Sequence, residues 1–317
     1  MFKVLLITFA GVVLGYLLRN ASCLRFLSKS ITYTIWALLL CFGLQVGSNE
    51  QVVNNLHTLG VKAFVISLAG ALGSCVAAWA VLRFILKGSL PLESVVQTGE
   101  NIGKNNAGNF YGGFVIVAFF AVGCAIGCLS ALPEEIVQGK FSMYVLYFLM
   151  VQVGMSIGGD KRLKQMLAGM SLKFLFLPLG TIVGTLVFVG LAVFMMPGVE
   201  LFDGLAIGAG FGYYSLSSVL ITQIKEASQG VALAAQLGTM ALMANIMREF
   251  MTLLFAPIIC KVFGRLAPVS VGGATSMDST LPVIAAVCGK DLVFVSIFHG
   301  VLVDFSVPFL VTFFASL

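Results

Sequence analysis

The chain has 317 residues, of which 59% are hydrophobic and only 10% are charged. Soluble globular proteins carry about 25% charged residues, so this composition excludes a soluble protein and indicates a polytopic membrane protein. The formal net charge of +5 does not indicate a nucleic-acid partner, because the Lys and Arg residues are spread among short loops, where they set membrane topology. The seven cysteines form no Cys-x-x-Cys pair, and we expect neither a metal site nor a cofactor.

Ten apolar segments follow one another along the chain, and the longest stretch between them, about 87–109, is too short for a soluble domain. A helix needs about 20 apolar residues to span a bilayer. We therefore predict an all-α polytopic protein with a single membrane domain over 1–317. The apolar segments cover 2–18, 31–47, 62–86, 111–132, 141–158, 168–196, 204–222, 230–262, 271–288 and 292–316.

The loops between the first six segments alternate in charge. The loops at 19–30, 83–110 and 159–167 carry Lys and Arg, whereas the loops between them carry mainly Glu. Cytoplasmic loops are enriched in Lys and Arg, so the N-terminus and the loop at 197–203 are expected outside.

Two glycine-rich segments, 204–222 and 271–288, decide the remaining topology. If 204–222 crossed fully, Lys261 and Arg265 would lie outside, against the positive-inside rule. If both segments dip into the membrane and return, Lys261, Arg265 and Lys290 all lie inside. We therefore predict about eight transmembrane helices plus two re-entrant or broken segments that enter from opposite faces, with both termini outside.

Internal similarity predicts inverted-topology repeats. Phe42–Gly47 resembles Met150–Gly154, and each is followed by a charged loop and by a span that opens with a lysine close to a phenylalanine. The segments 1–86 and 111–196 therefore form two copies of three spans, and the odd number of spans inverts the second copy.

A second, weaker repeat lies in the region 204–317, which we assign to the substrate pathway. Gly210–Val219 aligns with Gly272–Leu281, and each copy precedes a span with an acid before a phenylalanine, Glu249 or Asp304. Two broken segments in corresponding positions of two halves are the best sequence indication of a transporter's binding site.

Three acids lie inside predicted spans or broken segments: Glu249, Asp278 and Asp304. A charged group at the bilayer centre costs about 2.5–3.5 kcal/mol on insertion scales, so such acids are rarely present for stability. Two acids in one cavity can bind a cation in one state and protons in the other, which is the minimal chemistry of cation–proton exchange. Arg248 either faces a carbonyl or another acid while Glu249 faces the pathway, or forms an internal ion pair between two helices.

Small polar residues surround these acids. Asn245 lies four residues before Glu249 on the same helix face, where it can orient that carboxylate or bind substrate directly. Glycine lets the backbone unwind, and the freed N–H groups, with Ser and Thr hydroxyls, favour a carboxylate. The alternative is helix packing in which the hydroxyls bond back to carbonyls. The remaining candidate residues are Gly210, Gly212, Tyr213, Tyr214, Ser215, Ser217, Thr275, Ser276, Ser279 and Thr280.

Three further polar residues are expected to have packing roles. His299 lies five residues before Asp304, and we favour a packing histidine over a proton relay. Gln45 and Gln152 occupy matching places in the first repeat and are expected to form hydrogen bonds between helices.

Gly210–Ser217, Arg248-Glu249, Gly273–Val283 and His299-Gly300 together resemble the bacterial lysine exporter family, LysO type. The resemblance is specific over about 206–316 and mainly hydropathic over 1–200. It implies an inner-membrane exporter of L-lysine that also acts on the toxic analogue thialysine. It further implies that the acids matching Glu249 and Asp278 are needed for export, whereas Asp304 rests on the weaker repeat alone.

Lysine carries two ammonium groups and one carboxylate at neutral pH, which suits a site with two acids and a helix N-terminus. An inside-negative potential opposes the export of a cation by about 2.3 kcal/mol per 100 mV, so export needs coupling, and we expect proton antiport through Glu249 and Asp278. The residues do not distinguish lysine from ornithine or arginine.

Other classes of function fit less well. No His/Cys metal spacing, His-Glu-x-x-His or Gly-x-Ser-x-Gly motif is present, so we expect no enzyme. A structural membrane protein would not need buried acids in glycine-broken segments. A cation–proton antiporter or another small-solute secondary transporter on a similar inverted-repeat scaffold remains the alternative. The expected partners are L-lysine, protons and the lipid bilayer, and the sequence does not decide between a monomer and a homo-oligomer.

Overall fold

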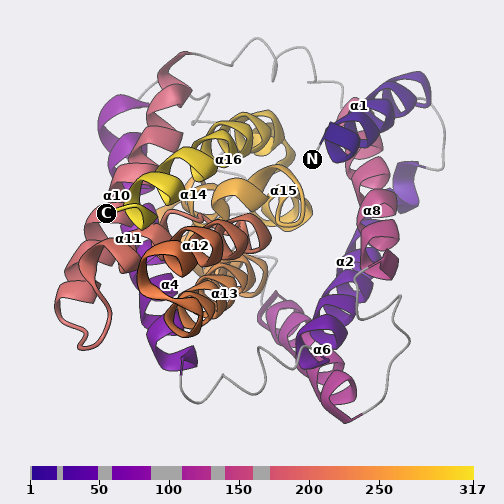
Figure 1. Ribbon diagram of the computed structural model, residues 1–317. Coiled ribbons are helices and arrows are strands. Elements are labelled where there is room, and N and C mark those ends of the chain that lie inside the picture. Colours follow the sequence, from indigo (N-terminus) through magenta and orange to yellow (C-terminus); the bar gives the residue numbers. More distant parts are fainter. Residues whose placement is uncertain (1, 20–23, 49–58, 87–108, 130–139, 160–171) are drawn as a thin grey trace. The chain divides into compact units, whose positions relative to one another are not determined.

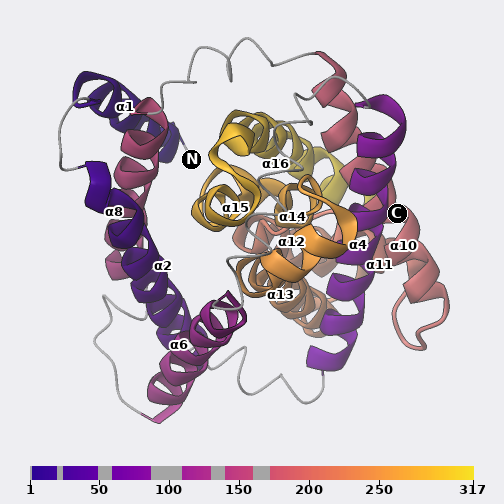
Figure 2. The ribbon, with the colours of Figure 1, turned by 180° about the vertical axis from the view of Figure 1, so that it is seen from behind.

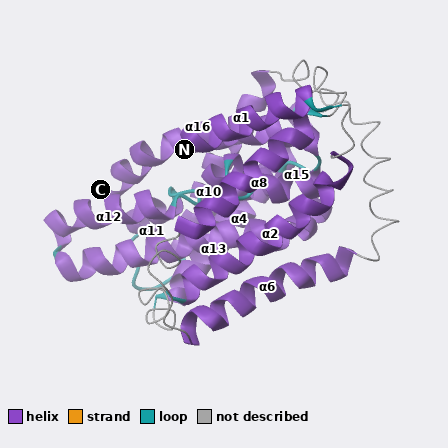
Figure 3. Cartoon of the chain, turned by 90° about the vertical axis from the view of Figure 1, so that its right-hand side faces the viewer, coloured by secondary structure: helices purple, strands orange, loops and turns teal. Residues whose placement is uncertain are grey.

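The computed structural model describes residues 2–19, 24–48, 59–86, 109–129, 140–159 and 172–317. Every regular element in these ranges is helical, as Figure 3 shows, so the predicted all-α class is confirmed for them. The chain divides into two compact units. Unit 1 comprises Met1–Val53 and Leu86–Ser171, and unit 2 comprises Asn54–Ile85 and Leu172–Leu317.

Helices of membrane-spanning length occur within the described ranges. Gly60–Ile85, Lys173–Phe194 and Lys290–Ala315 are long and apolar enough to cross a membrane. Shorter apolar helices cover Lys29–Leu44, Ala118–Leu129 and Phe141–Ser156. The composition and these helices together define an α-helical membrane protein.

Unit 1 contains two tightly packed helix pairs (Figure 1). Helix α1 (Phe2–Leu17) packs along α8 (Lys140–Gly158), and α2 (Leu24–Gly47) packs along α6 (Asn109–Leu129) and also contacts α8. Gln152 of α8 donates a hydrogen bond from Nε2 to Oγ of Ser30 in α2 at 2.8 Å, which is the expected bond between helices. The side chain of Gln45 lies outside the described part of the chain.

Glycines set the close approach in both pairs. Gly11 of α1 faces Val151 and Gly154 of α8, whereas Gly127 of α6 faces Leu44 and Gly47 of α2. A Cβ at either glycine would collide with the backbone of the opposite helix. Small residues let helix backbones approach closely in membranes. In the alignment of the first repeat, Leu44 and Gly47 of α2 correspond to Val151 and Gly154 of α8. The two contacts therefore use corresponding residues of the two copies.

Unit 2 is built around α4 (Gly60–Ala80), α10 (Phe176–Phe194) and the 33-residue helix α13 (Val231–Phe263). A π-helical turn, η1 (Val81–Ile85), extends α4, and a 3-10 turn, η3 (Leu172–Leu175), precedes α10. Helix α4 packs against both α10 and α13. Gly73 of α4 and Gly184 of α10 lie in backbone contact, so these two helices also meet through glycine.

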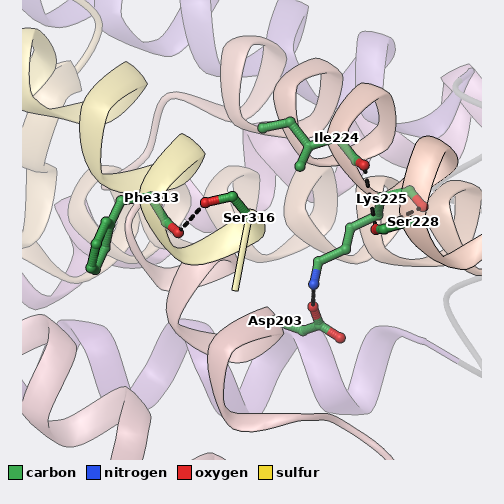
Figure 4. A network of polar contacts seen from close by, with 6 residues as sticks. All are labelled: Asp203, Ile224, Lys225, Ser228, Phe313 and Ser316. Atoms are coloured by element: carbon green, nitrogen blue, oxygen red, sulfur yellow. Dashed lines mark hydrogen bonds and ion pairs between the residues drawn. The ribbon is translucent and has the colours of Figure 1, made fainter.

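The first glycine-rich segment folds back on itself. Helix α11 (Leu201–Gly208) is followed by an irregular break at 209–213 and by α12 (Tyr214–Gln229). Nζ of Lys225, near the end of α12, lies 2.7 Å from Oδ1 of Asp203 at the start of α11, as Figure 4 shows. The two ends of the segment are therefore adjacent, and we call Leu201–Gln229 hairpin 1.

Hairpin 1 is longer than the predicted segment 204–222. The apolar pattern stops there because residues 223–229 include charged and amide side chains, yet α12 continues through them. Lys225 is only 3% exposed, since its charge is neutralised by Asp203. After a turn at Gly230, α13 runs back along α12.

The second glycine-rich segment also returns to its starting end (Figure 2). It consists of α14 (Ala267–Gly272), the 3-10 turn η4 (Gly273–Met277) and α15 (Leu281–Cys288). Arg265, which precedes α14, donates from Nε to the Cys288 carbonyl at 2.6 Å and pairs through Nη2 with Oδ1 of Asp291 at 2.7 Å. We call Arg265–Asp291 hairpin 2. A short turn, η5 (Lys290–Leu292), leads into α16 (Val293–Ala315).

Candidate functional site

The breaks of the two hairpins are in direct contact within unit 2. The Ala274 amide donates a hydrogen bond to the Phe211 carbonyl at 2.9 Å. Gly212 and Gly273 flank this contact with φ angles of 93° and 58°, which glycine adopts without the cost that other residues incur. Phe211 itself has a φ of 45°, an uncommon conformation for a bulky residue, and its side chain is fully buried. The meeting of the breaks therefore depends on backbone conformations that regular helices lack.

Asn245 of α13 fastens the break of hairpin 1. Its Nδ2 donates to the carbonyls of Ile207 at 3.1 Å and Ala241 at 2.9 Å, and its Oδ1 accepts the Gly212 amide at 2.8 Å. Gly210 packs so closely on this amide that a Cβ would overlap it. Asn245 was predicted either to orient Glu249 or to bind substrate; its hydrogen bonds go to hairpin 1 and to its own helix, and substrate binding by Asn245 stays a prediction.

Arg248 of α13 fastens the break of hairpin 2. Its Nε and Nη2 donate to the carbonyls of Val271 and Ser270, at 3.0 and 3.2 Å, at the end of α14. The same guanidinium reaches Oγ of Ser74 in α4 at 2.7 Å and Oγ1 of Thr185 in α10 at 3.1 Å. A cation at the carbonyl end of a helix is favourable. Of the two arrangements that the sequence allowed, Arg248 adopts the one that faces carbonyls.

Two carboxylates meet at the end of this break. Glu249 of α13 is 6% exposed and accepts a hydrogen bond on Oε1 from the Ser279 hydroxyl. Asp278 accepts the Ser279 backbone amide on Oδ1 at 2.6 Å, and the Ser279 hydroxyl lies 3.5 Å from the same oxygen. Ser279 thus forms hydrogen bonds with both acids, which come from different elements of unit 2.

The third predicted acid is near this pair. Asp304 of α16 lies within electrostatic range of Asp278, and Tyr213 lies within range of both. Tyr214, the first residue of α12, is within range of Glu249 and Asp278. The structure therefore gathers the three candidate acids around the start of α12.

Most other hydroxyls of the candidate residues bond to backbone carbonyls of their own hairpin. Such bonds within a hairpin are the predicted alternative to substrate binding by these hydroxyls. The bonds run from Thr275 to Gly272 at 2.9 Å, from Ser276 to Gly273 at 2.7 Å, from Thr280 to Thr275 at 3.0 Å and from Ser217 to Tyr213 at 2.9 Å. Ser215 differs from them because it is exposed at the start of α12.

His299 has the contacts of a packing residue. It is fully buried, with Nδ1 3.0 Å from Oγ of Ser276 and Nε2 2.9 Å from Oγ1 of Thr181. Both ring nitrogens are thus occupied by hydroxyls. This arrangement agrees with the packing role that we favoured. Within the described ranges, no group of His, Cys, Asp and Glu residues is suited to hold a metal ion.

Four polar residues of unit 2 with structural roles were not predicted from the sequence. Ser74 and Thr185 hold Arg248, and Asp203 with Lys225 closes hairpin 1. A serine or threonine within a glycine-rich apolar helix is a weak signal for such a contact. The ion pair had no local signal, because its two residues belong to different helices of one hairpin.

Acidic side chains beside two meeting helix breaks, in a membrane protein whose described part is all-α, are typical of a membrane transport protein. Charged groups and irregular backbone inside such proteins occur where they face a substrate or ion pathway.

Comparison with known proteins identifies the family. A family model described as "Lysine exporter LysO" matches residues 5–103 and 117–315. The chain is 28% identical over 328 residues to "Lysine exporter LysO" of Escherichia coli (strain K12), with 100% of both chains covered. It is 32% identical over 114 residues to "Putative lysine exporter" of Haemophilus influenzae (strain ATCC 51907 / DSM 11121 / KW20 / Rd), covering 36% of this chain and 54% of that protein. No solved structure matches. The chain belongs to the lysine exporter LysO family, and is thereby an amino-acid exporter.

Proposed function

We propose that this protein exports L-lysine, and analogues such as thialysine, across the bacterial inner membrane in exchange for protons. The observation that carries this proposal is the pair of carboxylates, the buried Glu249 and the partly buried Asp278, joined by Ser279 beside the junction of the two hairpins. Two acids attract a substrate with net charge +1, and buried charges are stable only when they are paired.

The start of α12 supplies a complement for the substrate carboxylate. No side chain caps this helix at Tyr213, and the following residues, Tyr214 and Ser215, are exposed. The first N–H groups of a helix and its dipole favour an anion. Tyr214 lies within electrostatic range of Glu249 and Asp278, so one amino acid can place its carboxylate at α12 and an ammonium group at the acids.

Coupling to protons follows from the charge of the site. When the substrate leaves, Glu249 and Asp278 face each other without a cation, and uptake of protons removes that repulsion. Protons that enter the cell down their gradient can therefore reset the site. Export of a cation against an inside-negative potential requires such a source of about 2.3 kcal/mol per 100 mV.

We further propose that both hairpins are re-entrant segments among about eight transmembrane helices, with both termini outside. The ion pairs Asp203–Lys225 and Arg265–Asp291 support this topology, because each joins the two ends of one hairpin. The matching glycine contacts of Gly11 and Gly127 support inverted repeats over 1–86 and 111–196.

Labelling of single cysteines tests the topology. Ser228 and Lys261 are exposed near the opposite ends of α13, whereas Lys225 is buried in its ion pair and suits labelling less well. In intact cells, a membrane-impermeant maleimide should modify Ser228→Cys, and Lys261→Cys should react only after permeabilisation. The reverse pattern would contradict the proposed topology.

Reconstitution in liposomes tests the transport reaction. Vesicles loaded with labelled lysine and a pH-sensitive dye should show lysine efflux together with proton movement in the opposite direction. An imposed pH gradient should accelerate the efflux, and a sodium gradient should not. Lysine efflux that neither responds to pH nor moves protons would refute antiport, and the absence of any lysine movement would refute the substrate assignment.

A further inference from the structure

A pair of cysteines lies at the base of hairpin 2. Cys260, near the end of α13, and Cys288, the last residue of α15, are free thiols whose side chains are hydrogen-bonded to each other. Arg265, five residues after Cys260, donates from Nε to the Cys288 carbonyl at 2.6 Å and so keeps the two cysteines side by side. Cys260 is partly exposed, whereas Cys288 is only 3% exposed.

Helix α13 contacts α15 at both ends of α15. At the start of α15, Glu249 accepts the hydroxyl of Ser279, and at its end Cys260 meets Cys288. Cys260 follows Glu249 by 11 residues, which places the two side chains on the same face of α13, about three turns apart. The face of α13 that presents the acid to hairpin 2 therefore also presents the thiol.

The two contacts differ in how they respond to transport. Alternating access requires one part of a transporter to move against another around the bound substrate. In the proposed function the substrate binds at Glu249 of α13 and Asp278 of hairpin 2, so these elements must move apart to release it. The hydrogen bond to Ser279 can break during this movement. A covalent bond between the two cysteines, at the other end of α15, would oppose it.

Oxidation by two electrons forms such a bond. Thiols in hydrogen-bond contact are already close to bonding distance. Hydrogen peroxide oxidises the sulfur of the partly exposed Cys260 to a sulfenic acid and is itself reduced to water. The Cys288 thiol then attacks that sulfur, the S–O bond breaks, and a second water leaves with the thiol proton. Two thiols and one peroxide thus give one disulfide and two waters.

We propose that Cys260 and Cys288 form a reversible disulfide that locks hairpin 2 to α13 and stops export under oxidising conditions. The effect on export rests on the proposed function, and the proposed topology places both thiols near the inside, next to Lys261. Cytosolic disulfides are usually transient or redox-sensing rather than structural. The pair therefore acts as a switch, which small thiols reverse by exchange with the disulfide.

Lysine efflux from proteoliposomes that contain the reduced, full-length chain measures the effect. Hydrogen peroxide should lower the efflux at least tenfold, and dithiothreitol should restore it. Cys260→Ser and Cys288→Ser should export lysine as the unaltered protein does and should lose the sensitivity to peroxide. Alanine replaces serine at either position if a serine variant does not fold. Cys128→Ser removes an exposed cysteine of α6 in unit 1 and, as the matched control, should stay sensitive.

Mass spectrometry detects the bond directly. Trypsin cleaves after Lys and Arg, so Cys260 and Cys288 lie on separate peptides, 249–261 and 266–290, each with a single cysteine. The oxidised protein should yield these two peptides joined, and dithiothreitol should separate them.

The outcomes distinguish the inference from the proposed function. Separate peptides after oxidation, full export by the linked protein, or inhibition by peroxide that persists in both serine variants would overturn the inference and leave lysine export intact. Failure of the reduced protein to export lysine would instead overturn the proposed function, because the linked peptides are detected whether or not lysine moves.

Discussion

Hairpins 1 and 2 share one design and differ in the chemistry at their breaks. In the alignment of the weaker repeat, Ser217 corresponds to Ser279, and Leu216 stands where hairpin 2 has Asp278. Both serines form hydrogen bonds with α13: Ser217 with Asn245, and Ser279 with Glu249. The neutral Asn245 amide thus bonds to the break of hairpin 1, and the Glu249 carboxylate bonds to the break of hairpin 2. The two hairpins can therefore share a similar backbone arrangement although only hairpin 2 has acidic side chains at its break.

The ion pairs that close the two hairpins also differ, and here the charges of hairpin 1 are the more deeply buried ones. The pair Asp203–Lys225 closes hairpin 1 with side chains that are 5% and 3% exposed, whereas Arg265 and Asp291 of hairpin 2 are 25% and 37% exposed. Hairpin 1 thus has a buried ion pair at its base and a neutral break. Hairpin 2 has a partly exposed ion pair at its base and a charged break. Hairpin 1 therefore buries its charged pair at its base, whereas hairpin 2 has partly exposed charges both at its base and at Asp278.

The largest expected effect comes from making the break of hairpin 2 neutral. Asp278→Asn removes the charge at the position where hairpin 1 has Leu216, and should lower lysine export at least about 100-fold, because the ammonium group loses an ionic partner. Export is measured as lysine released by cells fed a lysine-containing dipeptide. Leu216→Asn is the matched control and should retain most export. Normal export by Asp278→Asn would contradict the assigned difference between the hairpins.

The ion pairs provide the next test. Asp203→Asn leaves the Lys225 charge buried without a partner and should cost about 3–5 kcal/mol of stability. Asp291→Asn makes the same change in the partly exposed pair of hairpin 2 and should cost about 1 kcal/mol or less. Chemical unfolding in detergent, followed by circular dichroism, compares the two variants. Equal losses would show that burial of the pair does not govern its contribution.

A smaller effect is expected from the glycines of the hairpins. Gly273→Ala places a Cβ against the Phe211 carbonyl and imposes a φ of 58° on alanine, so it should lower stability by about 3 kcal/mol. Gly230, in the turn after hairpin 1, also has a positive φ of 85°, but a Cβ there would meet nothing within 4 Å.

Gly230→Ala is therefore the matched control, and it should cost only the backbone term of about 1–2 kcal/mol. The apparent melting temperatures of the two purified variants measure the difference. If Gly230→Ala proves as damaging as Gly273→Ala, the contact between the two breaks contributes little.

Local properties of the sequence predicted the helices and the candidate acids. Long apolar runs placed α4 with its extension η1, and α16, to within a few residues, because burial in a bilayer is encoded by hydrophobicity over about 20 consecutive residues. Glycine-rich runs located both breaks, since glycine tolerates the positive φ angles that they contain. Glu249 and Asp278 stood out because charges are rare in such segments.

The tertiary structure alone decided the partners of these residues. The hydrogen bond from Arg248 to Ser74 joins positions 174 residues apart, and the bond from Asn245 to Ile207 joins positions 38 apart. Asn245 shares a helix face with Glu249, yet it contacts the break of hairpin 1, because carbonyls that leave their helix must find new donors. No periodic pattern in the sequence predicts where those carbonyls lie. For the same reason, the sequence named Ser279 as one hydroxyl among several, and only the folded chain placed it between the two acids.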